Sequence, residues 1–216
     1  MSKWLNILLN ILYPKFCINC QKEGEYLCED CLSLVDINNS LTFLKSKYLN
    51  GLYFAAPYNH FIVKKAINQF KYEPFIKELS KPLAFLIIAH LKILGKTSFP
   101  QFVIIPVPLY KKRLKWRGFN QAEEIAKEIS NALNIPIFNN VLTKIKETPA
   151  QVELKKEERE KNVINAFKCQ NSDLIKGKKI LLIDDVFTTG TTMEESGRVL
   201  KLAGAKEIWA MVIARG

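Results

Sequence analysis

The 216-residue chain is poor in histidine and has no apolar run long enough to cross a membrane. His60 and His90 are the only histidines and neither lies in a motif, so the sequence does not indicate a histidine-based catalytic site. Apolar residues make up 48% of the chain, as in ordinary globular proteins, but polar residues interrupt the longest stretches, and we expect no transmembrane helix. The full Gly-x-x-x-x-Gly-Lys-Ser/Thr spacing of a Walker phosphate loop is also absent.

The N-terminus lacks the features of a secretory signal. The apolar run from Trp4 to Leu12 contains two asparagines, has no small-residue cleavage site and leads directly into a cysteine pair. We predict an amphipathic helix here that packs against the rest of the protein. The length favours one main domain with a small appendage, and we place the appendage at residues 1–40 and the main domain at 41–216.

Two Cys-x-x-Cys pairs follow, Cys17 with Cys20 and Cys28 with Cys31. Each pair places two sulfurs on a tight turn, and a short hairpin that joins the turns gives a tetrahedral site for structural Zn²⁺. The alternatives are disulfides, which suit secreted proteins, and a redox dithiol, which needs only one pair. Cys169 stands alone and is expected to be a small buried apolar residue.

An apolar run at residues 180–183 leads into Asp184 and Asp185 and then into a Thr/Gly loop. The run is typical of a strand buried on both faces of a parallel sheet, and ligands of such sheets bind beyond the carboxyl ends of the strands. Carboxylates accept hydrogen bonds from sugar hydroxyls. The loop and a helix beginning near Met193 would form an anion site, so the segment indicates a ribose phosphate ligand. The alternative is a buried strand followed by an ordinary capped turn.

Predicted strands and helices alternate along the main domain, which implies an α/β fold with a parallel sheet. We predict strands at residues 53–58, 102–105, 141–142, 180–183 and 208–214. We predict helices at residues 61–72, 75–94, 120–133 and 194–202.

A cluster of bases follows the strand at 102–105: Lys111, Lys112, Arg113, Lys115 and Arg117. Tyr110, Trp116 and Phe119 lie among them. Cations that follow phosphates and aromatic rings that stack on bases suit single-stranded nucleic acid, and the net charge of +11 is consistent with a polyanionic partner. A solvated basic face is the alternative.

The acid pair with its Thr/Gly loop resembles the 5-phosphoribosyl-1-pyrophosphate (PRPP) motif of type I phosphoribosyltransferases. The resemblance implies that Asp184 and Asp185 are the catalytic acids and hold the ribose hydroxyls, that Mg²⁺ accompanies PRPP, and that the 5′-phosphate binds Thr188, Thr189, Gly190, Thr191 and Thr192. It also implies a pyrophosphate loop at Val107, Pro108, Leu109, Lys112 and Arg113. A mobile hood would occupy residues 147–161, and a solvated helix is the alternative for residues 153–161.

The whole layout is similar to that of the ComF family: a four-cysteine knuckle, Phe70-Lys71-Tyr72, Pro106-Val107-Pro108-Leu109, Arg117-Gly118-Phe119-Asn120-Gln121 and the acid motif. The Arg-Gly-Phe-Asn-Gln run is the specific element, because the PRPP motif alone fits many salvage transferases. Ile18 follows the first cysteine where a proline is common, which makes the turn less rigid but leaves the metal site intact.

The resemblance implies a type I phosphoribosyltransferase fold with a parallel central sheet, plus a small N-terminal zinc-binding module. It also implies a PRPP-binding protein of natural competence that handles incoming single-stranded DNA in the bacterial cytoplasm, with other competence or recombination proteins as candidate partners. The alternative is a salvage or biosynthetic enzyme that transfers ribose 5-phosphate from PRPP to a nitrogen acceptor. The sequence leaves catalytic activity, the acceptor and the oligomeric state open.

Overall fold

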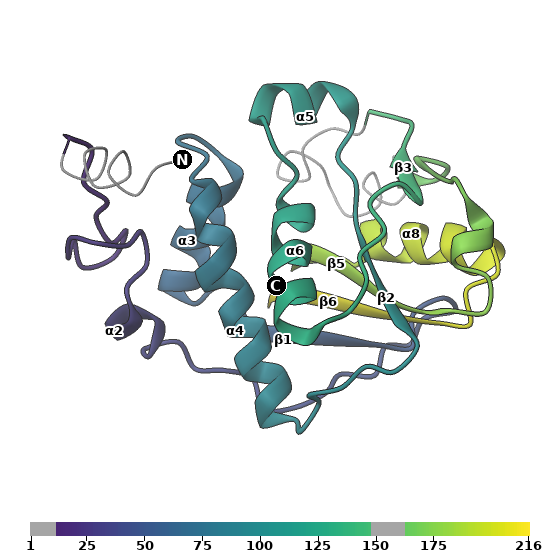
Figure 1. The fold of residues 1–216 in the computed structure, drawn as a ribbon, viewed down its shortest axis with the longest axis horizontal. Coiled ribbons are helices and arrows are strands. Elements are labelled where there is room, and N and C mark those ends of the chain that lie inside the picture. Colours follow the sequence, from purple (N-terminus) through teal and green to yellow (C-terminus); the bar gives the residue numbers. More distant parts are fainter. Residues whose placement is uncertain (1–11, 148–162) are drawn as a thin grey trace.

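A computed structural model describes residues 12–147 and 163–216 (Figure 1). The predicted N-terminal helix and the predicted hood lie almost entirely outside these residues. The described strands are β1 (Gly51–Pro57), β2 (Phe102–Pro106), β3 (Leu142–Lys144), β4 (Phe167–Cys169), β5 (Lys179–Phe187) and β6 (Glu207–Arg215). The α-helices are α2 (Glu29–Leu32), α3 (Phe61–Lys71), α4 (Ser80–Ile93), α5 (Lys111–Arg117), α6 (Gln121–Leu133) and α8 (Thr191–Leu202), and the 3-10 helices are η1 (Lys77–Leu79) and η2 (Ser172–Leu174).

The central sheet is parallel, as predicted, with the strand order β1, β6, β5, β2 (Figure 1). Leu182 of β5 is in register with Ile105 of β2 on one side and with Ala210 of β6 on the other. Because parallel neighbours end at the same edge, the segment after β2 lies beside the end of β5. The Val107 N–H donates to the Ile183 carbonyl at 2.9 Å, which fixes that neighbourhood.

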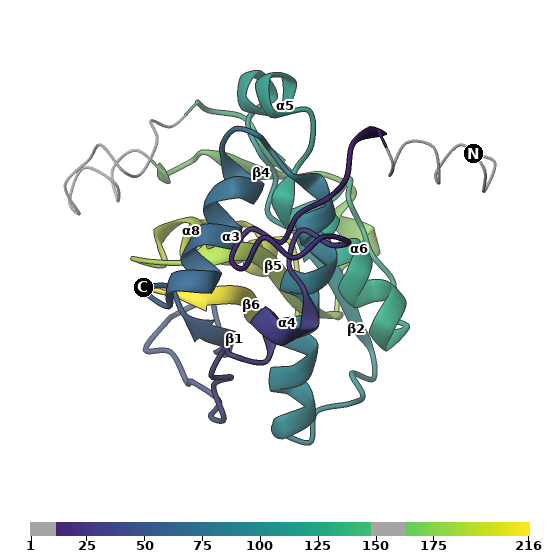
Figure 2. The ribbon, with the colours of Figure 1, turned by 90° about the vertical axis from the view of Figure 1, so that its left-hand side faces the viewer.

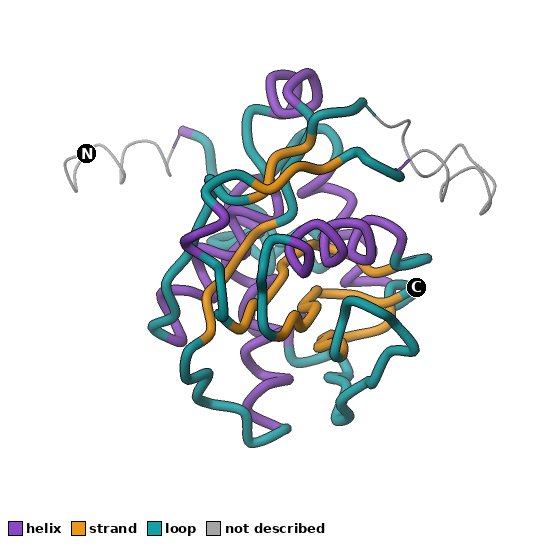
Figure 3. The backbone as a smooth tube through the Cα atoms, turned by 90° about the vertical axis from the view of Figure 1, so that its right-hand side faces the viewer, coloured by secondary structure: helices purple, strands orange, loops and turns teal. Residues whose placement is uncertain are grey.

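Helices cover both faces of this sheet. Helices α3, α4 and α6 lie on one face and α8 lies on the other (Figures 1 and 3). Leu181 and Ile183 of β5 belong to the apolar cluster on the first face, whereas Ile180 and Leu182 belong to the cluster on the second. Alternation along a strand that is buried on both faces explains why its sequence is continuously apolar.

The strand predicted at residues 141–142 is not part of the central sheet. It forms β3, which pairs antiparallel with β4, a strand that the sequence analysis missed. Each has three residues, too few for a periodic signal. Instead, Ile137 bridges to Ile104 in parallel at the β2 edge. Cys169 lies at the end of β4 and is only partly buried, contrary to the prediction.

Several predicted boundaries also shift. Strand β5 extends through Phe187, so both motif acids lie within the strand rather than after it. The predicted helix at 75–94 is divided into η1 and α4. The basic segment at 111–117, for which no helix was predicted, is helix α5, which ends at Gly118 with φ 83°. That left-handed conformation suits glycine and turns the chain sharply into α6.

The cysteine knuckle packs against the layer of helices that contains α3 and α4 and does not stand apart from the main domain (Figure 2). Cys17, Leu27 and Cys31 share one apolar cluster with residues of α3 and α4, including Phe70 and Leu83. The Asn38 N–H also donates to the Ala55 carbonyl of β1 at 2.7 Å. The boundary near residue 40 therefore remains a prediction, because the two parts share a core. In the described part of the chain, no helix is both long enough and apolar enough to cross a bilayer.

Candidate functional site

The carboxyl ends of β2 and β5 open into a cavity of about 400 Å³. The loops after both strands line it, together with the last turn of α3, the end of α5, the start of α6 and β3. Most residues predicted to bind PRPP are among its walls: Asp184, Asp185, Thr188, Gly190, Thr191, Thr192, Val107, Pro108, Leu109 and Arg113. The sheet thus brings together two segments that the sequence analysis could relate only by resemblance.

Two of the predicted ligand residues lie outside the cavity wall. The Thr189 hydroxyl is 2.9 Å from the Thr191 hydroxyl, so the Thr189 side chain forms a hydrogen bond within the loop. Lys112 extends from α5 with its side chain 77% exposed and forms an ion pair with Glu147 at 3.4 Å. Neither side chain is placed to contact a ligand that fills the cavity as it stands.

The two motif acids have different surroundings. Asp185 is 4% exposed, and its Oδ1 accepts a hydrogen bond from Lys71 Nζ at 2.9 Å. Asp184 accepts a hydrogen bond from the Asp185 backbone N–H at 2.9 Å. Burial, followed by the charge of Asp185, raises the pKa of Asp184 to about 7. Asp184 therefore holds its proton more tightly than a carboxyl group in water does.

Lys71 is the site residue that the sequence analysis missed most clearly. It is the last residue of α3, and it lies 114 positions from the acid that it pairs with. Burial lowers the pKa of Lys71, but the carboxylates of Asp185 and Asp184 outweigh that effect and raise it, so the ammonium is charged. The Phe70-Lys71-Tyr72 run was noted only as part of a resemblance, and nothing local marks this lysine as a site residue.

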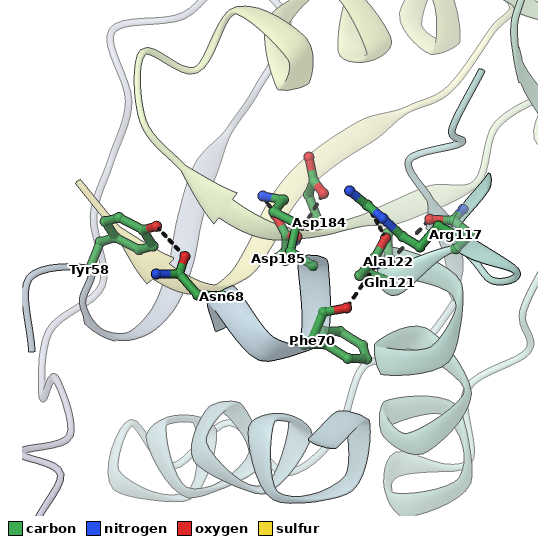
Figure 4. A network of polar contacts seen from close by, with 10 residues as sticks. Tyr58, Asn68, Phe70, Arg117, Gln121, Ala122, Asp184 and Asp185 are labelled. Carbon is green, nitrogen blue, oxygen red and sulfur yellow. Dashed lines mark hydrogen bonds and ion pairs between the residues drawn. The ribbon is translucent and has the colours of Figure 1, made fainter. Parts of the chain in front are cut away.

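A hydrogen-bonded bridge joins α3 to the turn between α5 and α6 (Figure 4). The Gln121 side chain accepts a hydrogen bond from Arg117 and donates one to the Phe70 carbonyl at 3.0 Å. Arg117 is 7% exposed and points from α5 toward Asp184 (Figure 4). Among the described residues, its Nε has no hydrogen-bond partner. The bridge thus holds a buried guanidinium at the cavity wall with unused donor capacity.

The start of α6 is fixed in the same region. The Asn120 side chain caps the helix by accepting from the Ala122 N–H at 3.2 Å, and its amide donates to the Val107 carbonyl at 3.0 Å. Asn120 thereby anchors the predicted pyrophosphate segment to α6, as Gln121 anchors the end of α3. The sequence analysis quoted both residues only as members of the Arg-Gly-Phe-Asn-Gln run.

The Thr/Gly loop turns tightly into α8. Gly190 has φ 79°, and a Cβ at this position would lie 2.5 Å from Cζ of the Phe187 ring, so only glycine fits without displacement. Gly190 caps α8 without any side-chain hydrogen bond. The first N–H groups of a helix have no partner within the helix, and an anion at this end satisfies them. This geometry suits a phosphate group.

The charges of the cavity favour an anion. The described residues of its walls include four cationic side chains, Lys71, Arg113, Arg117 and Lys144, and two acids. Burial, with Arg113 nearby, lowers the pKa of Lys144 to about 8, so this side chain remains mostly charged at neutral pH. Cationic side chains gathered in one cavity suit a phosphorylated ligand, because charge-assisted hydrogen bonds to phosphate oxygens are strong.

The residues predicted to bind nucleic acid separate into two groups. Lys111, Lys112, Lys115 and Trp116 lie on exposed parts of α5, and Trp116 is 57% exposed. Phe75 packs edge-on against Trp116 with ring centroids 4.9 Å apart, which orients the indole at the cavity wall. By contrast, Arg117 is buried, and Phe119 is buried against Phe70. A base cannot stack on a ring that is already packed in the core, so the structure does not offer Phe119 for the predicted role.

The four cysteines of the knuckle form a cluster suited to a metal. Their Sγ atoms lie within 4.8 Å of one another, and the Cys17–Cys31 and Cys20–Cys28 pairs are each separated by 3.6 Å. A tetrahedral Zn²⁺ with bonds of about 2.3 Å separates its sulfurs by about 3.8 Å. All four are free thiols rather than disulfides. The donor set therefore fits a structural metal such as zinc.

The parallel sheet, the acid pair at its edge and the glycine-centred loop before α8 together define a type I phosphoribosyltransferase fold. The family model described as "Phosphoribosyl transferase domain" matches residues 119–216, which contain β5 and α8. "Competence protein F" of Haemophilus influenzae is 31% identical over 202 residues, which cover 93% of this chain and 84% of that protein. The chain therefore belongs to the ComF family of competence proteins.

Other relatives share shorter segments. "DNA utilization protein YhgH" of Escherichia coli K12 is 31% identical over 110 residues, half of this chain and 48% of that protein. "Competence protein ComFC" of Bacillus subtilis is 32% identical over 101 residues, which cover 46% of this chain and 38% of that protein. These similarities confirm the family resemblance that the motifs suggested.

Proposed function

We propose that this chain binds PRPP with Mg²⁺ and acts in natural transformation by handling incoming single-stranded DNA in the cytoplasm. The observation that carries the PRPP part is the convergence of two chain segments on one cavity. The acid pair and Thr/Gly loop of one segment meet the Val107–Arg113 region of the other, and cationic side chains line the walls. The names of the relatives, "Competence protein F" and "DNA utilization protein YhgH", support the DNA part.

Each part of PRPP has a suitable partner in the cavity. The N-terminus of α8 and its Thr/Gly loop suit the 5′-phosphate, because an uncapped helix end presents N–H donors. Asp184 suits a ribose hydroxyl, as an acceptor when ionised and a donor when protonated. The cations on the α5 side suit the pyrophosphate. Mg²⁺ would be held largely through the ligand and water, and it would reduce the charge of the pyrophosphate.

The exposed surface of α5 suits a single strand. Trp116 offers a ring for stacking, and Lys111, Lys112 and Lys115 would follow the phosphates. Trp116 also lines the PRPP cavity. Single-stranded DNA bound to α5 would therefore lie at the entrance to the PRPP cavity. The binding of DNA and the binding of PRPP would then influence each other.

A second candidate is transfer of ribose 5-phosphate to a nitrogen acceptor. Tyr72 and Trp116 favour it, because both line the cavity and are partly exposed, so a planar base can stack there. The bond from ribose carbon 1 to pyrophosphate would break and a bond to the acceptor nitrogen would form. Asp184 and Asp185 would stabilise the positive charge that develops on the sugar. Pyrophosphate release that requires one particular base would favour this candidate over a role confined to DNA.

The first test is a calorimetric titration of the zinc-loaded protein with PRPP and Mg²⁺. We expect saturable binding in the wild type and a loss of at least tenfold in affinity for Asp184→Asn, since a charge-assisted contact contributes about 1.5–3 kcal/mol. Asp173→Asn is the matched control, because Asp173 is an exposed acid outside the cavity. Equal affinities in all three proteins would contradict the assignment of the site, and no wild-type binding would contradict the PRPP proposal.

The second test concerns DNA. Trp116→Ala should lower affinity for a short single strand by about fivefold or more at near-physiological salt, because one base stack contributes about 1–3 kcal/mol. Phe85→Ala is the control, since Phe85 is an exposed ring on α4 outside the cavity. If both variants bind like the wild type, stacking on Trp116 is excluded and only charge attraction remains.

A further inference from the structure

We propose that Lys71 is a ligand of the pyrophosphate group of bound PRPP and that Asp185 is the residue that positions it. The proposal rests on the proposed function and gives Asp184 and Asp185 different roles. Asp184 would contact the ribose, whereas Asp185 would act through the lysine.

The ion pair itself supplies the first argument. Lys71 Nζ lies 2.9 Å from Asp185 Oδ1, and the carboxylate side chain is 6% exposed whereas that of the lysine is 29% exposed. An ammonium has three N–H donors, and this bond uses one of them. Both residues line the cavity. Asp185 therefore fixes the Lys71 ammonium at the cavity wall, and the other N–H donors of the ammonium can reach a ligand in the cavity.

The position of Lys71 in the fold supplies the second argument. The Phe70 carbonyl accepts from Gln121, and the Phe70 ring packs on Phe119 with centroids 5.4 Å apart. The end of α3 thus abuts the turn between α5 and α6, which adjoins the predicted pyrophosphate segment. Arg117, held by the same Gln121, presents a buried Nε with no partner among the described residues. Lys71 of α3 and Arg117 of α5 therefore line the same part of the cavity, where their N–H donors suit an anion.

The chemistry of PRPP favours the pyrophosphate over the 5′-phosphate as the partner of Lys71. The 5′-phosphate has the start of α8, where backbone N–H groups supply the donors. The pyrophosphate carries the larger charge and needs cations rather than neutral donors. Ribose 5-phosphate keeps the first group and lacks the second. Comparison of the two ligands therefore isolates the contribution of Lys71.

Titration of Lys71→Met with PRPP, ribose 5-phosphate and inorganic pyrophosphate, each with Mg²⁺, tests the proposal. We expect the affinities for PRPP and pyrophosphate to fall about tenfold or more, and the affinity for ribose 5-phosphate to change by less than about threefold. Lys71→Arg should recover most of the lost affinity, because it keeps the charge. Asp185→Asn should reproduce the selective loss in weaker form. Lys64→Met is the matched control, since Lys64 is an exposed lysine on the same helix.

The outcomes separate the two proposals. Wild-type binding of PRPP with an unchanged ratio of PRPP to ribose 5-phosphate affinity in Lys71→Met would overturn the role of Lys71 and leave the PRPP site intact. An equal loss for both ligands would assign Lys71 a structural role only and would also overturn it. Failure of the wild type to bind either PRPP or pyrophosphate would overturn both proposals. Circular dichroism of each variant establishes that it is folded, and Lys71→Arg decides the question if Lys71→Met is not.

Discussion

The cysteine knuckle and the cavity are both built from residues with strong chemistry, but they are assembled in opposite ways. The knuckle takes its outermost ligands, Cys17 and Cys31, from positions 14 apart in the chain. The cavity joins Lys71 to Asp185 across 114 positions and depends on the parallel sheet to bring them together. The knuckle is a closed set of four sulfurs, whereas the cavity is open and lined by cationic side chains.

This difference assigns the two regions different tasks. A closed, mostly buried cluster has no position for a substrate, and it shares a core with α3 and α4, so it stabilises the fold. An open cavity lined by cationic side chains suits an anion, so it serves a ligand. Damage to the knuckle should therefore lower stability, and damage to the cavity should change affinity. Three predictions test this contrast, in order of expected effect.

Removal of the metal should produce the largest effect. We expect Cys28→Ser to lower the free energy of unfolding by about 4 kcal/mol or more, because loss of a structural metal is among the most disruptive single changes. Urea unfolding of the zinc-loaded protein, with metal content measured in parallel, checks this. Cys169→Ser is the control, because Cys169 lies outside the cluster. Equal unfolding midpoints for the wild type and Cys28→Ser would contradict a structural role for the knuckle.

Gly190→Ala should have an intermediate effect that falls mainly on the ligand. The residue has φ 79°, and a methyl group would meet the Phe187 ring at 2.5 Å, so the phosphate loop must shift. We expect stability to fall by about 1–2 kcal/mol and PRPP affinity to fall by about tenfold or more.

Gly177→Ala is the matched control for that variant. Gly177 has φ 72°, so an alanine there would impose a similar backbone strain. A Cβ added at this position would meet no atom within 4 Å, and Gly177 lies outside the cavity. Both variants should lose similar backbone stability, but only Gly190→Ala should lose PRPP affinity in calorimetry. Parallel losses of affinity in the two variants would show that general destabilisation, and not the phosphate loop, limits binding.

The same contrast explains how much the sequence could predict. The Cys-x-x-Cys pairs and the acid motif are local, so the sequence alone identified them, and the parallel sheet followed from alternating strands and helices. The role of Phe119 was not predictable, because its burial depends on a contact with Phe70, which lies far away in the sequence on α3. Lys71 escaped notice for the same reason. Strands β3 and β4 were too short to leave a periodic pattern.

The smallest predicted effect concerns the pH dependence of stability and comes from Asp184. Burial and the neighbouring Asp185 raise its folded pKa to about 7 from the ordinary value of 3.8, so the folded state holds the proton more tightly than the unfolded chain. The associated stability is fully present below the unfolded pKa and is lost as pH rises through the folded one. Asparagine cannot ionise. Asp184→Asn should therefore gain stability relative to the wild type between about pH 4 and pH 7.

Urea unfolding of the two proteins at pH 5 and pH 8 checks this, with Asp173→Asn as the control for loss of an exposed acid. The advantage of Asp184→Asn should be larger at pH 8, where the wild-type cavity contains the ionised pair. A constant difference at both pH values would show that Asp184 is already ionised throughout this range. A gain in stability together with a loss of PRPP affinity would show that the cavity keeps an unfavourable charge for its ligand.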